Sequence, residues 1–161
     1  MPNISLAHNW LADCGFAPKP NRIIVPINAF LRADKTQSDA SSPKININIP
    51  AGTYNIWLAS SDGYKGRASA NQTKEQYFLK LYSGSNYIGK TNSISDLDNN
   101  VDYAYLEEKV NSNFVLSQNI SSIIAFHTAY PDNAHSLSAV CAAFDSISLP
   151  TVITKPAIYT Y

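Results

Sequence analysis

The segment from Lys44 to Leu58 reads KININIPAGTYNIWL and alternates apolar with polar residues on both sides of a turn signal. Before Pro50 every second residue is isoleucine, with asparagine between, and after Gly52 the alternation resumes. Successive side chains of a strand point to opposite faces, so a period of two predicts strand, turn, strand, each with one buried face. The segment therefore indicates antiparallel β structure.

Similar short segments run through the rest of the chain. Proline has no N–H to donate, so Pro26 makes the first expected strand an edge strand or a bulged one. Gly84 marks a turn between two strands, and Asn111 and Ser112 interrupt a later one. About eight strands at this spacing predict an all-β fold, an antiparallel β-sandwich of the jelly-roll kind. The expected strands are 22–30, 45–49, 52–60, 75–82, 86–91, 103–110, 113–116 and 121–129, with one or two more in 136–149.

The length of 161 residues suits one domain with a substantial core. We expect an N-terminal arm over 1–21, a sandwich domain over 22–149 and a C-terminal tail over 150–161. Apolar residues at helical spacing between Ser5 and Cys14 predict a short helix or an ordered arm. The segment 33–43 is polar and is expected to be a loop.

Charge narrows the range of partners. The chain has 12 basic and 12 acidic residues and a formal net charge of zero. It has no general attraction for phosphate backbones or anionic lipids, which argues against nucleic-acid and membrane-surface roles. No apolar run is long enough to span a bilayer, so membrane insertion is not expected. The N-terminus does not read as a secretory leader. We nevertheless expect an extracellular or cell-surface location, with the leader absent from this chain.

Cys14 and Cys141 lie far apart in the sequence, and two interpretations remain open. Free cysteines are commonly buried, which favours two buried thiols. The alternative is a disulfide that ties the N-terminal segment to the last strands and implies an oxidising compartment. The spacing does not suit a structural zinc site.

Catalysis is not expected. Glu107 and Glu108 are adjacent on an expected strand, so they face opposite ways and cannot form the carboxylate pair of a glycosidase. His127 and His135 lie near Asp132, but no serine sits in the turn that a nucleophile requires. We therefore predict a protein that is not an enzyme.

A dense acidic and amide loop is the best candidate metal site. It contains Asp96, Asp98 and Asp102, with two asparagines between them. Calcium prefers six to eight hard oxygen ligands, which such side chains and loop carbonyls supply. Turns also favour Asp and Asn for purely local reasons, so a solvated turn is the competing interpretation.

Trp57 alternates with Ile56 and Leu58 and so occupies the opposite face of its sheet. An exposed tryptophan there would be a platform for a sugar ring, and a covered one would belong to the core. Large aromatic side chains are highly buried on average, which favours the core.

Three segments, 52–64, 93–100 and 126–149, together resemble bacterial extracellular β-sandwich modules of the carbohydrate-binding or lectin-like kind. The resemblance implies a jelly-roll sandwich, often stabilised by calcium, in which loops contact the ligand. No catalytic residue carries over from it.

Two hypotheses for function follow. The first is a non-catalytic recognition or adhesion module that binds a glycan or cell-surface polymer through Asp62, Tyr64, Asp132 and Asn133. The alternative is a self-assembling structural subunit of an extracellular fibre, appendage or coat, with terminal arms that pack on neighbouring copies. A surface rich in uncharged polar side chains and in tyrosine, of which there are ten, suits either.

Overall fold

The computed structural model describes residues 14–33, 40–62, 77–94, 105–127 and 135–147. These residues form nine strands, and no helix lies within them. The strands are β1 (Arg22–Ala33), β2 (Ala40–Ser41), β3 (Ile45–Ile49), β4 (Gly52–Asp62), β5 (Tyr77–Ser83), β6 (Asn86–Lys90), β7 (Tyr105–Leu116), β8 (Ile120–His127) and β9 (His135–Ser146). The predicted helix between Ser5 and Cys14 lies almost wholly outside the described residues, and the C-terminal tail wholly outside.

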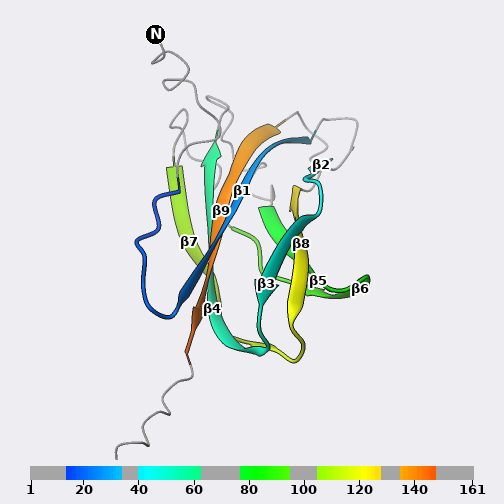
Figure 1. Ribbon diagram of the computed structural model, residues 1–161. Coiled ribbons are helices and arrows are strands. Elements are labelled where there is room, and N and C mark those ends of the chain that lie inside the picture. The colour runs from blue at the N-terminus through cyan, green and yellow to red at the C-terminus, as the bar shows by residue number, and fades with distance from the viewer. Residues whose placement is uncertain (1–13, 34–39, 63–76, 95–104, 128–134, 148–161) are drawn as a thin grey trace, which may run out of the picture.

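The strands form two facing antiparallel sheets (Figure 1). Sheet A has the order β1-β9-β4-β7, and sheet B has the order β2-β8-β5-β6, with β3 also paired to β8. The predicted all-β sandwich is confirmed. Its core lies between the sheets and includes fully buried side chains from both. Each such burial contributes about 1.5–3 kcal/mol relative to exposure in water. The largest of these side chains are Tyr77, Phe144, Leu31, Ile49, Ile56, Leu58, Leu79, Leu81, Ile94, Ile120 and Ile123.

The alternating segment from Lys44 to Leu58 is strand, turn, strand as predicted, but its two strands belong to different sheets. β3 pairs with β8, whereas β4 pairs with β7 and β9. The Tyr54 hydroxyl donates to the Pro50 carbonyl (2.6 Å), and the Ala51 N–H donates to the Asn119 side chain (2.8 Å). These bonds hold the chain where it crosses from one layer to the other.

Pro26 has the predicted effect on β1. The strand is an edge of sheet A, and its register with β9 shifts between Pro26 and Ala29. Asn28 within this bulge has a φ of 49°, a left-handed conformation that asparagine tolerates better than most residues. The bulge and the proline limit pairing of this edge with other chains.

The predicted break at Asn111 and Ser112 is wrong, because β7 continues through it as one strand of 12 residues. The register with β4 shifts here, and Asn113 has a φ of 55°. The Asn113 N–H donates to the side-chain oxygen of Asn55 (3.0 Å). This bond satisfies a donor that the bulge removes from the ladder, so the strand bends without ending.

One other segment differs from expectation. The segment 33–43 is not entirely a loop, since the end of β1 and the short β2 lie in it. The segment 136–149 was expected to hold one or two strands. Its described part holds one, β9, which lies between β1 and β4 in sheet A.

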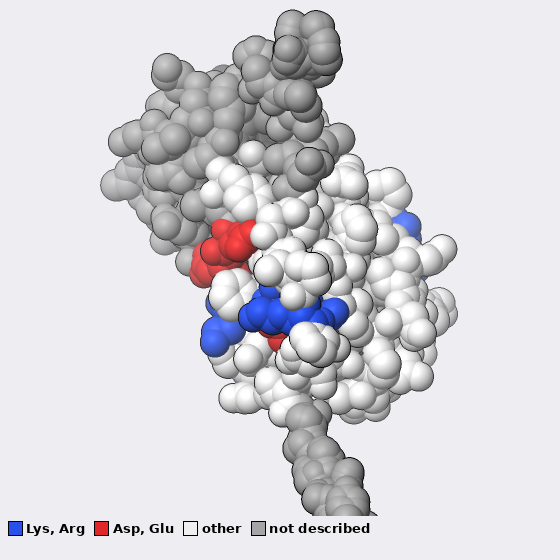
Figure 2. All heavy atoms as spheres, turned by 60° about the vertical axis from the view of Figure 1, so that its left-hand side comes forward, with Lys and Arg blue, Asp and Glu red and all other residues white. Residues whose placement is uncertain are grey.

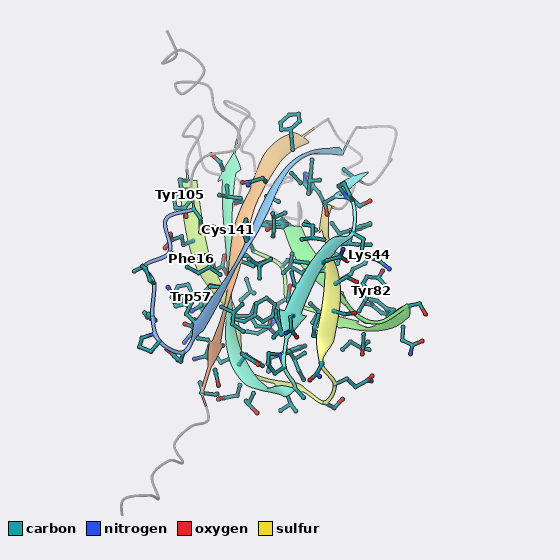
Figure 3. All side chains as sticks on the ribbon, viewed as in Figure 1. Phe16, Lys44, Trp57, Tyr82, Tyr105 and Cys141 are labelled. Carbon is teal, nitrogen blue, oxygen red and sulfur yellow. A yellow bond between two sulfur atoms is a disulfide. The ribbon has the colours of Figure 1, made fainter. Side chains whose placement is uncertain are left out.

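The outer face of sheet A is covered by residues 14–21. Phe16, which is buried, packs edge-on to the half-buried Trp57 at 6.3 Å between ring centroids (Figure 3). A disulfide joins Cys14 to Cys141 in β9, with 5.9 Å between their Cα atoms. The interpretation as free thiols is therefore wrong. Trp57 is half-buried and packs against a small cluster of buried residues, so it is neither a fully exposed platform nor part of the buried core, and its cover comes from this segment and not from the second sheet.

Candidate functional site

The predicted ligand and metal residues fall almost entirely outside the described residues. Asp62 is the last residue of β4, and its side chain is not among those described. The other predicted residues lie outside the described residues, and their roles stay predictions. Within the described residues, no group of three or more His, Cys, Asp and Glu side chains could hold a metal ion. The residues outside are Tyr64, Asp96, Asp98, Asp102, Asp132 and Asn133.

The strand ends that flank these predicted residues do lie together. In sheet A, Asp62 is opposite Leu137, and Ser61 is opposite Tyr105. In sheet B, Tyr77 is opposite His127 and forms an isolated bridge with Ile94. The connections that contain the predicted ligand and metal residues therefore start and finish at the same end of the sandwich.

The described residues form a different candidate site, on the side of the sandwich where both sheets end. β6 is the last strand of sheet B, and β7 is the last strand of sheet A. Among the described strands, β6 pairs only with β5, and β7 pairs only with β4. The outward backbone groups of an edge strand are free to pair with another chain.

Between these two edges lies a groove of about 590 Å³, which we call the β6–β7 groove. Four uncharged polar side chains, Ser85, Asn86, Ser117 and Gln118, line it together with an apolar set. Val115 is 68% exposed and Tyr87 is 52% exposed, so both present apolar surface to solvent. Among the described residues that line the groove, none is Asp, Glu, Lys, Arg or His. The apolar set is Leu81, Tyr87, Ile88, Phe114, Val115 and Leu116.

A tight turn positions one wall of the groove. Gly84 has a φ of 62°, which glycine adopts without strain, and its N–H donates to the Ser121 hydroxyl (2.8 Å). The turn brings the rings of Tyr82 and Tyr87 into an edge-to-face contact at 5.6 Å. Tyr87 is thus held in place although half of its surface meets solvent.

Asn92 ties the two edges together. Its backbone N–H donates to the Asn111 side-chain oxygen (2.9 Å), and its side-chain nitrogen donates to the Val110 carbonyl (2.8 Å). Asn92 follows β6, and both acceptors lie in β7, so these bonds link the edge of sheet B to the edge of sheet A. They fix the spacing of the walls.

A second groove, of about 420 Å³, lies on the opposite side, between Ile23–Pro26 of β1 and Ile45–Asn48 of β3. β3 belongs to the alternating segment from Lys44 to Leu58. Ile47 and Asn48 have no register partner in β8, because the ladder shifts between Asn46 and Ile49. Both sides of the sandwich therefore carry a groove between two sheet edges.

The chemistry available in the β6–β7 groove is packing and hydrogen bonding. It offers apolar surface, side-chain amides and hydroxyls, and unpaired edge-strand backbone. Sequence reasoning missed it because its walls come from separate strands of different sheets. The only local signals were Tyr87, one of many tyrosines, and Val115, which resembles any strand residue.

Comparisons with known proteins yield only structural likeness. No family model and no curated protein matches the chain. Among solved structures, that of the infectious bursal disease virus VP2 subviral particle matches 84% of this chain and 35% of its own, with a TM-score of 0.54 and 11% identity. That of the infectious bursal disease virus Gt strain matches 81% of this chain and 32% of its own, with a TM-score of 0.51 and 10% identity.

The chain thus spans about a third of the length of those viral proteins. The resemblance to bacterial lectin-like modules stays a prediction. In the part of the chain that the structure describes, no helix is long and apolar enough to cross a membrane. At this level of identity the likeness shows the fold alone, and the fold is the antiparallel sandwich shared with these viral proteins.

Proposed function

We propose that this chain is a non-catalytic structural subunit that assembles with copies of itself. The observation that carries the proposal is the β6–β7 groove, an uncharged recess with exposed apolar side chains between two open sheet edges. Depletion of charge, exposed aromatic surface and available edge strands are features of surfaces that pack against protein.

The chemistry of the groove suits a protein partner. Val115 and Tyr87 are exposed to water, and a partner that covers them would bury their apolar surface. Burial of apolar surface is the main favourable term in association. A stable interface buries about 800 Å² on each partner, more than these two side chains provide. The neighbouring edges, which hold uncharged polar groups and backbone donors and acceptors, would supply the remainder.

The structural likeness supports this proposal over a lectin function. The VP2 protein, which shares this fold, stands in a subviral particle. A sandwich with grooves on both sides can contact two neighbours at once, which a closed shell or a fibre requires. The disulfide between Cys14 and Cys141 supports an oxidising, extracellular setting.

The test is the association state of the purified protein, measured by sedimentation velocity over a range of concentrations. Val115→Asp places a carboxylate in the groove, and an unpaired charge is costly to bury, so we expect the dissociation constant to rise by at least about tenfold. Ser41→Asp is the matched control, because it adds the same charge at an exposed position at the other edge of sheet B. A wild-type protein that stays monomeric at all concentrations would contradict the proposal.

The calcium site remains a separate proposal for Asp96, Asp98 and Asp102. If they bind calcium, chelation lowers the thermal midpoint, and replacing all three with Asn removes that response. A midpoint that does not depend on calcium would favour the solvated turn.

A further inference from the structure

The outer face of sheet B carries lysines that lie over aromatic rings. The Lys80 ammonium lies 3.9 Å from the centre of the Phe126 ring, and the Lys90 ammonium lies 4.8 Å from that of Phe78. A cation over a ring face is attracted by the ring quadrupole, and the contact holds the long side chain in one place. The ammonium groups are therefore positioned over the sheet.

A third lysine extends this surface toward β3. The Lys44 ammonium lies 4.6 Å from the centre of the Tyr82 ring (Figure 3). Tyr82 in turn contacts Tyr87, whose ring is half exposed. We call Lys44, Lys80 and Lys90, with the rings beneath them, the lysine face.

Within the described residues, no acidic side chain on sheet B offsets the positive charge of the lysine face. Lys80 and Lys90 are directly opposite each other in the β5–β6 ladder, and like charges in that position are destabilising. Among the acidic side chains that the structure describes, Glu107, Glu108 and Asp145 all belong to strands of sheet A.

Protection against aggregation explains only part of this pattern. A lysine on an edge strand blocks pairing with other sheets, which accounts for Lys90 in β6. Lys80 lies in β5, which is paired on both sides, so it has no edge to protect. An unfavourable pair in which one lysine, Lys80, lies away from the edge points to a ligand that benefits from both charges.

We propose that the lysine face binds an acidic polysaccharide, with its sulfate or carboxylate groups on the lysines. Compact ammonium groups pair well with such anions, and the exposed ring of Tyr87 offers an apolar surface to a sugar. Nucleic acid fits less well, because ammonium groups occupy the ring faces on which bases would stack. This surface differs from the predicted ligand residues. It shares Tyr87 with the β6–β7 groove, whereas its three lysines lie outside the groove.

The test is titration calorimetry with a size-defined heparin oligosaccharide at low salt. Lys80→Gln with Lys90→Gln keeps polar, unbranched side chains but removes two charges, and we expect affinity to fall by at least about tenfold. Lys19→Gln with Lys109→Gln is the matched control, because it removes two exposed lysines outside sheet B. Its affinity should stay within about twofold of wild type.

Three results would overturn the proposal. They are no heparin binding by the wild type, equal losses in the two double variants, and binding of neutral dextran as tight as that of heparin. A single-stranded polyuridylate that binds more tightly than heparin, and is lost with the same lysines, would assign the face to nucleic acid instead. The titration is repeated with Val115→Asp, the variant designed to weaken assembly. Failure of heparin binding can then be told apart from failure of assembly.

Discussion

The two sheets differ in what lies on their outer faces. On sheet A, residues 14–21 cover the face, and Arg22 lies over the rings of Phe16 (5.2 Å) and Trp57 (5.9 Å). On sheet B, the lysines lie over similar rings, but no described segment covers them. In both places a cation lies over aromatic rings, yet only Arg22 has a described acidic partner.

That partner accounts for the difference in role. The Arg22 guanidinium donates two hydrogen bonds to the Asp145 carboxylate (2.7 and 2.9 Å), and a third to the Ala17 carbonyl (3.0 Å). The bonds to Asp145 raise the pKa of Arg22, and the two side chains are only 5% and 10% exposed. Figure 2 brings this side forward and shows its acidic and basic groups close together, with most of the remaining described surface uncharged. The charge of Arg22 is neutralised by Asp145, and Arg22 holds the covering segment in place. The lysines of sheet B have no described acidic partner, so their charges are available to a ligand.

Among the changes that test this comparison, removing the disulfide should have the largest effect on stability. Cys14→Ala with Cys141→Ala opens a loop that spans 127 residues, and we expect unfolding free energy to fall by about 3–5 kcal/mol. Urea unfolding measures the change. Reductant should weaken the wild type to a similar extent and leave the double variant unaffected; an equal response of both would contradict the covalent link.

Arg22→Met should cause the next largest loss of stability. It leaves the Asp145 carboxylate with little exposure and no guanidinium, which costs about 3 kcal/mol. Asp145→Leu in the same chain should recover part of the loss, and the double-mutant cycle measures the coupling. If the two single losses simply add, the pair does not act as a clamp.

Alkaline pH should also weaken the contact between residues 14–21 and the outer face of sheet A. Burial, more than the neighbouring Glu107, raises the pKa of Tyr105 to about 12. The folded state then holds this proton more tightly than the unfolded state, whose tyrosine titrates near about 10. This contribution to stability is present below about pH 10 and is lost as the pH rises through about 12.

The Tyr105 hydroxyl accepts the Gly15 N–H (2.7 Å) and donates to Glu107 (2.8 Å), so ionisation disturbs the covering segment. Thermal midpoints of wild type and Tyr105→Phe, compared between pH 9 and 12, test this expectation. The variant should show a shallower decline, although Tyr54 and Tyr77, whose pKa values burial also raises, keep part of it. Identical declines would mean that Tyr105 contributes nothing.

Lys80→Gln should change stability least. It relieves the repulsion with Lys90 and loses one cation–π contact, so the free energy of unfolding should shift by no more than about 0.5 kcal/mol. A loss as large as that of Arg22→Met would show that the lysine face is a structural element like the covered one.

The sequence predicted the local features of this fold. Alternation located β3 and β4, and the missing N–H of Pro26 predicted a bulged edge strand. The alternation can be read from neighbouring residues, and the missing N–H is a property of the proline ring itself. What alternation does not contain is the identity of a strand's partner, so it could not show that β3 and β4 lie in different sheets.

The sites were harder to predict for the same reason. The pairing of Cys14 with Cys141 depends on how close β9 comes to the N-terminal segment, which no local pattern reports. The β6–β7 groove depends on where two sheets end, and the lysine face depends on the register that sets Lys80 opposite Lys90. The predicted site residues come from turn chemistry, and all but Asp62 lie in the connections outside the described residues.

The position of β9 has a consequence for synthesis of the chain. It is the last described strand, yet it separates β1 from β4 in the middle of sheet A. The five strands of sheet B are complete by His127, whereas sheet A cannot close while the ribosome still holds its central strand. The apolar face of sheet B therefore stays uncovered until β9 has been made, and a chain cut short before β9 would leave β1 without its neighbour.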